Sequence, residues 1–431
     1  MTCTWPGEVL GQLRDPSWMR LGLAISAARQ MGLDKEADEI FFGQRRACYQ
    51  LGKYPSQIRR LTWLKCFELD IQLSCWHGLL PTLTSPESLQ TMASFNSTAA
   101  VSSEYATIIE IHRQTGMYLS ALGDGLATTL SPSLVRLHHR ALTNVKITHA
   151  QGWTINAEIA LQAAQVYLFA LCVVRLDREV NTSFDIPKSI RSDTSFLQEI
   201  LAGTQSSAVQ LICLLTSLSE QRNSIGVEQV KDSHPLSGTP KIVSCIAFFA
   251  AVVLLKYLES AHETLKQEDV EAARTAISSV HRMFTCCPTS AEHASAAGTL
   301  ECAGRAIGNR SACIPSFITT RMGASILHNV IWMSGMLRGR DKDPEFSEVL
   351  TVEAVSDGPP HEHELRGVAS TPIAAPEAFD GGAQAEFVSH FPFGVWDDAL
   401  YDGWTESWND DWMEYRGLGS DIDLNALLHS L

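Results

Sequence analysis

The sequence predicts an all-α protein: an irregular multi-helix bundle followed by a disordered linker and an acidic C-terminal tail. Apolar residues recur at helical spacing through most of the first 340 residues, whereas the alternation typical of strands is scarce. Hydrophobic residues make up 45% of the 431 residues and charged residues 19%, so the chain can bury a large core. We therefore expect a helical domain over residues 1–340, a flexible linker over 341–395 and an acidic segment over 396–431.

Two N-terminal helices carry start and stop signals. Asp15 can cap the first free amides, Pro16 suits the first turn, and the glycine at position 32 can adopt the left-handed conformation that closes a helix. A second helix is expected to begin near Pro55 and to run towards Gly78. Prolines at positions 81 and 86 prevent its simple continuation.

The remainder of the predicted domain is helical as well. Periodicity predicts further helices over residues 105–122, 134–149, 156–178, 196–220, 241–266, 270–284 and 318–337. No repeat of fixed period is found, which argues against a solenoid. The longest apolar run, residues 242–255, is shorter than the roughly 18 to 20 residues of a membrane span, so we interpret it as a buried core helix and expect no membrane partner.

Charge and cysteine content exclude several classes of protein. A formal net charge of -15 argues against the whole chain binding nucleic acid electrostatically, and we expect no sequence-specific duplex binding by this chain alone. Residues 1–20 show neither a signal peptide nor a transit peptide. The eleven cysteines are scattered without a CxxC pair, which favours reduced thiols inside a cell.

The sequence contains no recognisable catalytic motif. It lacks a nucleophile elbow, a phosphate-binding loop, a dinucleotide fingerprint and a zinc-protease helix, so we expect neither an enzyme nor a cofactor. His361 and His363 alternate with acidic residues in the predicted linker, but no second ligand cluster is near them and no metal site is expected. The other candidate side chains are assigned to packing or to the surface: Cys66, Cys75, His138 and His139.

A specific pattern occupies residues 17–83. It comprises a helix with an early Trp, a small-residue face and a closing Gly-Leu, then an Arg-Arg helix with a Trp and an aliphatic-Asp pair, then a glycine-proline turn. The residues that carry it are Trp18, Gly22, Ala24, Gly32, Leu33, Arg59, Arg60, Trp63, Leu69, Asp70, Ser74, Gly78 and Pro81. This stretch resembles the fungal-specific transcription factor domain, the middle homology region of the binuclear zinc-cluster regulators.

The chain also departs from that family. Leu64 replaces the usual second Trp, Ile71 replaces the Arg after the central Asp, and two residues rather than one separate Gly78 from Pro81. Members of the family typically carry an N-terminal six-cysteine zinc cluster, whereas this chain starts almost inside the middle domain. DNA binding is therefore expected to be absent from this chain, supplied by a partner, or located in a missing N-terminal module.

The resemblance implies a nuclear regulator of transcription that controls a specific metabolic or secondary-metabolite gene set in a fungus. Its helical domain would serve regulation or dimerisation, as a homodimer or with a zinc-cluster regulator. We expect Trp18 and Trp63 to pack between helices. Arg59, Arg60 and Asp70 are expected to form ion pairs or to cap turns rather than to contact DNA.

The last segment has the composition of an activation tail. Residues 396–431 contain nine acidic residues against Arg416 alone, and Trp404, Trp408 and Trp412 recur at intervals of four. A second apolar cluster contains Leu424, Leu427 and Leu428. Acids keep such apolar residues solvated until a partner buries them, which predicts recruitment of transcriptional co-activators. The alternative is a non-DNA-binding helical scaffold or effector-binding module whose tail acts as an intramolecular latch.

Overall fold

The computed structural model of the protein describes residues 16–35, 56–98, 101–123, 130–182, 194–225, 241–260, 266–286, 291–308 and 313–342. The chain divides into two units, residues 1–356 and 357–431, and every described residue belongs to the first unit. Within these ranges 86% of the residues are helical, in 11 α-helices, and no strand occurs. The predicted all-α fold is therefore confirmed, whereas the predicted tail and nearly all of the predicted linker lie outside the described residues.

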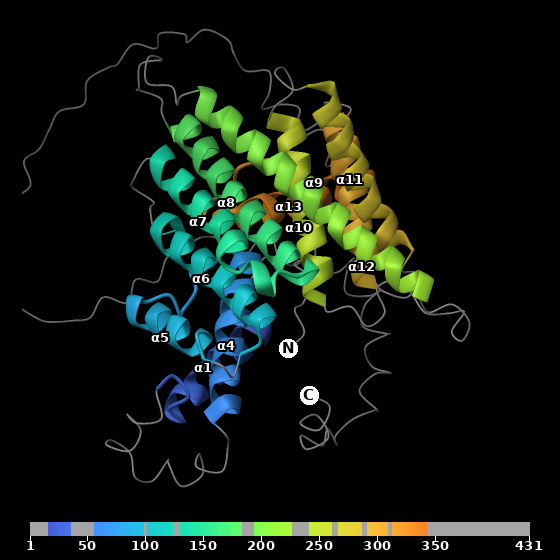
Figure 1. Ribbon diagram of the computed structural model, residues 1–431. Coiled ribbons are helices and arrows are strands. Elements are labelled where there is room, and N and C mark those ends of the chain that lie inside the picture. The colour runs from blue at the N-terminus through green and yellow to red at the C-terminus, as the bar shows by residue number, and fades with distance from the viewer. Residues whose placement is uncertain are drawn as a thin grey trace, which may run out of the picture. The chain divides into compact units, whose positions relative to one another are not determined.

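The helices appear in chain order in Figure 1, from α1 in blue to α13 in orange. Their bounds are α1 (Pro16–Gln30), α4 (Ser56–His77), α5 (Pro86–Asn96), α6 (Ser103–Gly123), α7 (Pro132–Thr148), α8 (Ile155–Thr182), α9 (Thr194–Ile225), α10 (Lys241–Ser260), α11 (Gln267–Thr285), α12 (Ala291–Gly308) and α13 (Ser325–Lys342). Two 3₁₀ turns, η2 (Ala150–Gly152) and η4 (Met322–Ala324), precede α8 and α13.

Helices α8 and α10 occupy the centre of the bundle. Helix α8 packs against α6, α7, α9 and α10, while α10 packs against α9, α11, α12 and α13. Helices α1, α4 and α5 lie next to one another (Figure 1) and join the rest through α6 and through the contact of α4 with η4. A helix covered on all sides must be apolar all round, and residues 247–255 of α10 are each at most 2% exposed.

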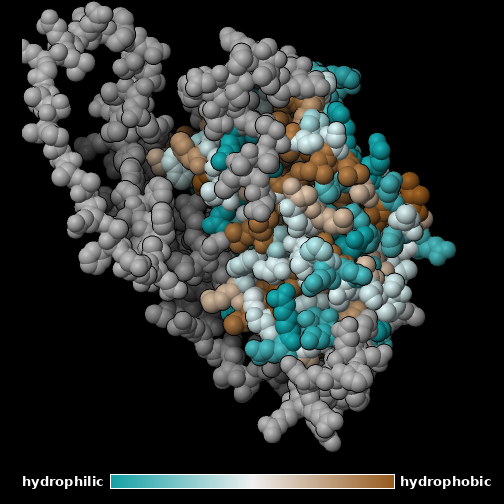
Figure 2. Space-filling model, turned by 90° about the vertical axis from the view of Figure 1, so that its left-hand side faces the viewer, coloured by the Kyte–Doolittle hydropathy of each residue, from teal (hydrophilic) through white to brown (hydrophobic). Residues whose placement is uncertain are grey.

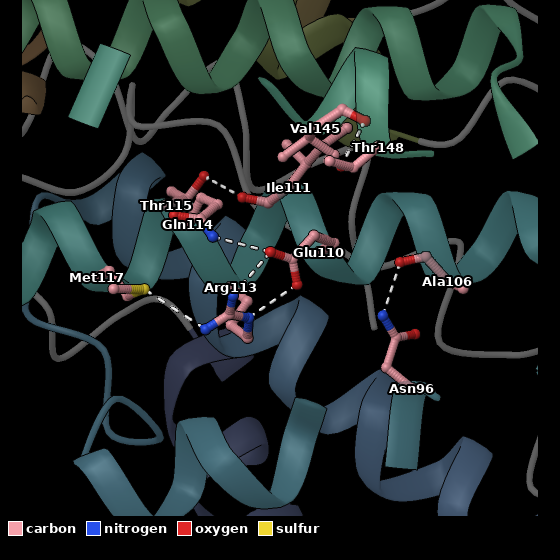
Figure 3. Close-up of polar contacts among 10 residues, drawn as sticks. All are labelled: Asn96, Ala106, Glu110, Ile111, Arg113, Gln114, Thr115, Met117, Val145 and Thr148. Atoms are coloured by element: carbon pink, nitrogen blue, oxygen red, sulfur yellow. Dashed lines mark hydrogen bonds and ion pairs between the residues drawn. The ribbon is translucent and has the colours of Figure 1, made fainter. Parts of the chain in front are cut away.

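A polar network on α6 lies beside its link to α5 (Figure 3). Glu110 accepts two hydrogen bonds from the guanidinium of Arg113 and one from the amide of Gln114, each at 2.8 Å. Burial alone would raise the pKa of Glu110, but these hydrogen bonds outweigh it and lower the pKa. Asn96, the last residue of α5, donates its side-chain amide to the carbonyl of Ala106 at 2.8 Å and so ties α5 to α6.

Helices α1 and α4 end at the glycines that the sequence predicts. Gly32 has φ of 68°, its amide donates to Arg29, and the Leu33 amide donates to the Ala28 carbonyl at 2.9 Å. These two hydrogen bonds form a Schellman motif, which satisfies carbonyls that the helix end leaves free. Gly78 has φ of 64°, and the amide of the next residue closes α4 in the same way.

Several predicted bounds were wrong. Helix α5 was not predicted because Pro86 was interpreted as a stop, but it stands in the first turn behind the N-cap Ser85. Helix α12 was missed because its residues are mostly small and form no stripe of large apolar side chains. The helix predicted over 318–337 begins only at Ser325, and the one predicted over 241–266 ends at Ser260, because Lys266 is the N-cap of α11.

Three helical segments are long and apolar enough to cross a membrane by length and composition alone: Ile155–Arg178, Ser195–Leu218 and Ile242–Ser260. The apolar run at 242–255, which is by itself shorter than a membrane span, thus belongs to a helical segment of 19 residues that reaches that length. In the most apolar 18 residues of these three segments, 83%, 44% and 72% of the residues, respectively, are buried inside the bundle. The least buried, in α9, exposes polar residues that include Gln198, Glu199 and Ser206, which is the pattern of a helix that faces water.

Truncating Trp63 is expected to destabilise the bundle strongly. Its side chain is 1% exposed, so Trp63→Ala should lower the free energy of unfolding by roughly 3 to 5 kcal/mol through lost core packing. Leu23, which is 67% exposed on α1, provides the control, and Leu23→Ala should change stability by less than about 0.5 kcal/mol. Urea unfolding measures both, and a parent-like midpoint for Trp63→Ala would contradict the packing described here.

Candidate functional site

The motif residues near the start of the chain join α1 to both ends of α4. Arg59 donates from Nη2 to the carbonyl of Gly32 at 3.0 Å, which links the end of α1 to the start of α4. Trp63 is buried one turn further along α4. The half-buried ring of Trp18 meets His77 edge-on, with ring centroids 6.3 Å apart. These contacts hold the two helices as one structural piece.

Asp70 organises the turn that follows α4. It is fully buried, and its two oxygens accept hydrogen bonds from the Leu83 amide at 2.8 Å and from the Thr82 hydroxyl at 3.0 Å. Burial raises the pKa of Asp70 against the opposing effect of these hydrogen bonds and of the Arg29 charge. Pro81 is buried in the same turn. The carboxyl group therefore points into the protein as a cap for the 81–83 backbone.

Two further motif residues, Arg60 and Gly22, have different surroundings. The guanidinium of Arg60 lies over the ring of Phe95, 5.7 Å from its centroid, so it packs against α5. Gly22 is exposed on α1, and a Cβ at this position would meet no atom within 4 Å. Nothing in the packing explains a glycine there.

Gly78 brings a distant segment, residues 313–324, against the end of α4. A Cβ at Gly78 would overlap the carbonyl oxygen of Arg321, so the two backbones are in direct contact. Met322, which follows Arg321, has a positive φ of 44°. Gly323 is buried against the backbone of α8. Segment 313–324 is therefore wedged between α4 and α8.

Two side chains fix the backbone of this segment from other elements. Asn329 of α13 accepts a hydrogen bond from the Ile318 amide at 3.0 Å and donates one to the Ile318 carbonyl at 3.1 Å. Glu259 of α10 accepts a hydrogen bond from the Ile314 amide. Residues 313–319 belong to no helix.

A cavity of about 350 Å³ lies between segment 313–324, the ends of α8 and α10, and the start of α13. Its charged wall contains Asp177 and Arg178 from α8 and Lys256 from α10. The rest of the wall is aliphatic or neutral and polar: Val174, Ile314, Pro315, Ser316, Ile318, Thr319, Ser325, Ile326 and Asn329. Apolar walls with a few converging polar groups are typical of small-molecule sites.

Lys256 is the buried cation of this cavity. It is 9% exposed, and its Nζ lies 2.9 Å from Asp177 Oδ2 and 3.0 Å from Glu259 Oε2. Burial alone would lower the pKa of Lys256, but the two carboxylates outweigh it and raise the pKa, so the ammonium is charged at neutral pH. Since Glu259 also binds the Ile314 amide, it couples Lys256 to segment 313–324.

The sequence reasoning missed this group of residues. Asp177 and Lys256 are charged residues near the ends of two of the most apolar helices, and that position was the available signal. A charge at the end of an apolar run is either a solvated terminus or a buried pair. Only the crossing of α8 and α10 distinguishes the two, because the partners are far apart in the chain.

His328 lies on α13 on the side of Arg321 and His77. Its side chain is 7% exposed. Burial, together with the positive charges of Arg321 and His77, lowers the pKa of His328 to about 4. The imidazole is therefore neutral at physiological pH.

A second buried polar cluster joins α4 to α6. Glu68 accepts hydrogen bonds from Lys65 at 2.8 Å, from Gln72 at 3.3 Å and from the Tyr105 hydroxyl at 3.0 Å. Gln72 also lies 3.4 Å from the buried His112 ring, and burial raises the pKa of Tyr105. Because Glu68 accepts hydrogen bonds from three side-chain donors, we interpret the cluster as structural.

The other candidates of the sequence are either buried or outside the described ranges. Burial raises the pKa of the Cys66 and Cys75 thiols, which lie on α4 and pack in the protein core as small apolar groups. Among the described residues, no three His, Cys, Asp or Glu side chains group closely enough to hold a metal ion. Positions beyond the described ranges include His361, His363, Trp404, Trp408, Trp412, Leu424, Leu427 and Leu428.

Comparisons of the chain with protein-family models, with curated proteins and with solved structures give no match. The resemblance of residues 17–83 to the fungal transcription factor domain therefore rests on the motif alone. Function is accordingly proposed from the residues themselves.

Replacing Gly78 is expected to be costly. Gly78→Ala puts a Cβ into the Arg321 carbonyl and forces an L-residue into the left-handed region, which by itself costs roughly 1 to 2 kcal/mol. We expect a total loss of more than about 2 kcal/mol in the free energy of unfolding. Gly22→Ala is the matched control: in an exposed helix interior with open space, it should stabilise by roughly 0.5 to 1 kcal/mol. Equal effects of the two changes in urea unfolding would refute the close approach.

The stability of the protein should fall as the pH drops below 6.5. The folded-state pKa of His328, about 4, lies below the ordinary value of about 6.5, so the unfolded chain binds the proton more readily between these values. This difference in pKa lowers the free energy of unfolding by about 2 kcal/mol at pH 5. His328→Leu abolishes the titration, so its unfolding free energy should decline less than that of the parent between pH 7 and pH 5. Identical declines would show that His328 does not contribute.

Proposed function

We propose that this chain is a nuclear regulator of transcription that controls a specific metabolic or secondary-metabolite gene set in a fungus. The observation that carries the proposal is the motif of residues 17–83, with its paired helices, Arg-Arg-x-x-Trp sequence, buried Asp and closing glycine. In support, Arg59, Asp70 and Gly78 each make a contact that holds one element of the helical domain to another. The helical domain would then serve regulation or dimerisation, and its role is not enzymatic.

DNA contact is assigned to another module or to a partner. Arg59 and Arg60 are directed towards Gly32 and Phe95 of the same chain, so their positive charges serve internal packing. The net charge of -15 opposes association with a polyanion. A zinc-cluster regulator bound as a heterodimer, or a homodimer of a form that carries such a module, would supply the DNA-reading element.

The acidic tail is proposed to recruit transcriptional co-activators. Its nine acidic residues surround Trp404, Trp408 and Trp412 and precede Leu424, Leu427 and Leu428. A partner groove that buries these side chains gains apolar burial, while the acids favour a partner with a basic rim. Large apolar anchors, more than any single acid, would therefore determine the affinity.

A second candidate function is favoured by the cavity beside Lys256. A helical module that binds a small effector, without DNA or co-activators, needs a built pocket inside a stable bundle, and the cavity of about 350 Å³ meets that need. In this alternative the tail is an intramolecular latch. The two candidates differ in whether the isolated tail acts on transcription.

Residues 391–431, fused to a heterologous DNA-binding domain, are expected to activate a reporter gene. Replacing Trp404, Trp408 and Trp412 together with Ala should remove most of the activity, because coupled folding and binding is driven mainly by apolar burial at about 25 cal/mol per Å². Asp410→Asn should change the activity only modestly, because one exposed charge contributes little at cellular ionic strength.

The control for this fusion is the full chain without residues 391–431. A silent fusion, together with a loss of thermal stability in the shortened chain, would support the latch and reject the activation tail. An active fusion with an unchanged melting temperature of the shortened chain is the result that the transcription proposal predicts.

A further inference from the structure

The cavity beside Lys256 is lined by both charged and aliphatic side chains. Lys256 stands among the ends of α8 and α10, whereas Val174, Ile318 and Ile326 contribute aliphatic surface. A ligand that fills such a space needs a polar head and a compact apolar body. At about 350 Å³ the space is at the small end of ligand sites, which suits a molecule of about ten non-hydrogen atoms.

Lys256 retains hydrogen-bonding capacity towards this space. An ammonium group has three N–H donors, and its partners in the described part of the chain are the two carboxylates of Asp177 and Glu259. One donor therefore remains on a side chain that is 11% exposed. An unsatisfied charged donor in a low-dielectric wall is costly, and a ligand oxygen would satisfy it.

The charges of the wall bear on the choice of head. Lys256 and Arg178 are cationic and Asp177 is anionic, and Glu259 binds Lys256 as a second anion without lining the cavity itself, so the four side-chain charges balance. The amino-terminal end of the 18-residue helix α13, at Ser325 and Ile326, also faces the cavity and adds positive potential. With the side-chain charges balanced, this helix end and the third N–H of Lys256 favour a head with one negative charge, whereas a second negative charge would be repelled by Asp177 and Glu259.

We propose that this cavity binds a small monocarboxylic acid with a compact hydrocarbon body, its carboxylate on Lys256 and its body against Val174, Ile318 and Ile326. This ligand would be the effector of the second candidate function, and only its role as a regulator rests on that proposed function. The site itself stands on the cavity and the charges of its wall.

The same contacts connect the ligand to the family motif. A carboxylate on Lys256 acts on Glu259, which holds the Ile314 amide, and a body against Ile318 acts on the backbone that Asn329 fixes. Segment 313–324 continues to Arg321, whose carbonyl touches Gly78. Binding should therefore stabilise the segment and the turn after α4 together.

The test is calorimetric titration of the full chain with three probe acids and their amides. The acids are hexanoate, cyclohexanecarboxylate and phenylacetate, and the matched neutral probes are hexanamide, cyclohexanecarboxamide and phenylacetamide. We expect at least one acid to bind saturably and at least tenfold more tightly than its amide. Hydrogen exchange with that acid present should slow the Ile314 and Ile318 amides and residues 78–84, while the surface of α11 stays unchanged.

Two pairs of variants locate the binding. Lys256→Met should weaken binding at least tenfold, whereas Lys266→Met, an exposed lysine before α11, should not. Because loss of Lys256 leaves two carboxylates uncompensated and can unfold the chain, Thr319→Trp supplies an independent test that fills the cavity without touching the charges. Thr320→Trp, its exposed neighbour outside the cavity wall, is the control for the added bulk.

Three results would overturn the proposal: no saturable binding of any probe acid, equal affinity for an acid and its amide, or unchanged binding in folded Thr319→Trp. The reporter fusion of residues 391–431 contains none of these residues. A failure of ligand binding and a failure of the transcription proposal are therefore separate results.

Discussion

The contact between the backbones at Gly78 and Arg321 is the constraint on which the arrangement of the bundle depends. Two chain segments more than two hundred residues apart meet there with no room for a Cβ, and Gly78 also needs φ of 64° to end α4. Because Arg321 is held at this point, η4 lies against α8 and helix α13 begins at Ser325. The position of the α1 and α4 pair relative to the central helices follows from this contact.

An electrostatic constraint holds the other end of the same segment. Lys256, Asp177 and Glu259 share two ion pairs at the ends of α8 and α10, and Glu259 extends the group to the Ile314 amide. Buried charges are tolerated only when each has a partner, so removing one member would leave another uncompensated. Segment 313–324 is thus held near Arg321 by the close backbone contact with Gly78 and near Ile314 by its hydrogen bond to Glu259. Residues between these two points line the cavity.

The residues of the family motif act mainly on the fold. Arg59 caps the end of α1, Asp70 holds the turn after α4, and Gly78 receives segment 313–324. Each has a physical reason to be present that requires neither DNA nor a ligand. We therefore assign the chemistry of the proposed regulatory function to the cavity beside Lys256 and to the acidic tail. The motif residue Gly78 contacts the segment that lines this cavity.

The sequence by itself determined the features that local interactions control. Helical periodicity indicated the all-α class, and the closing positions at Gly32 and Gly78 were readable because a left-handed cap is a property of a few consecutive residues. Tertiary structure alone decided that the last helix begins at Ser325 rather than at residue 318, since the side chain of Asn329 binds the backbone of Ile318. It also decided that Lys256 meets Asp177, because the crossing of two helices is a long-range property that no local pattern encodes.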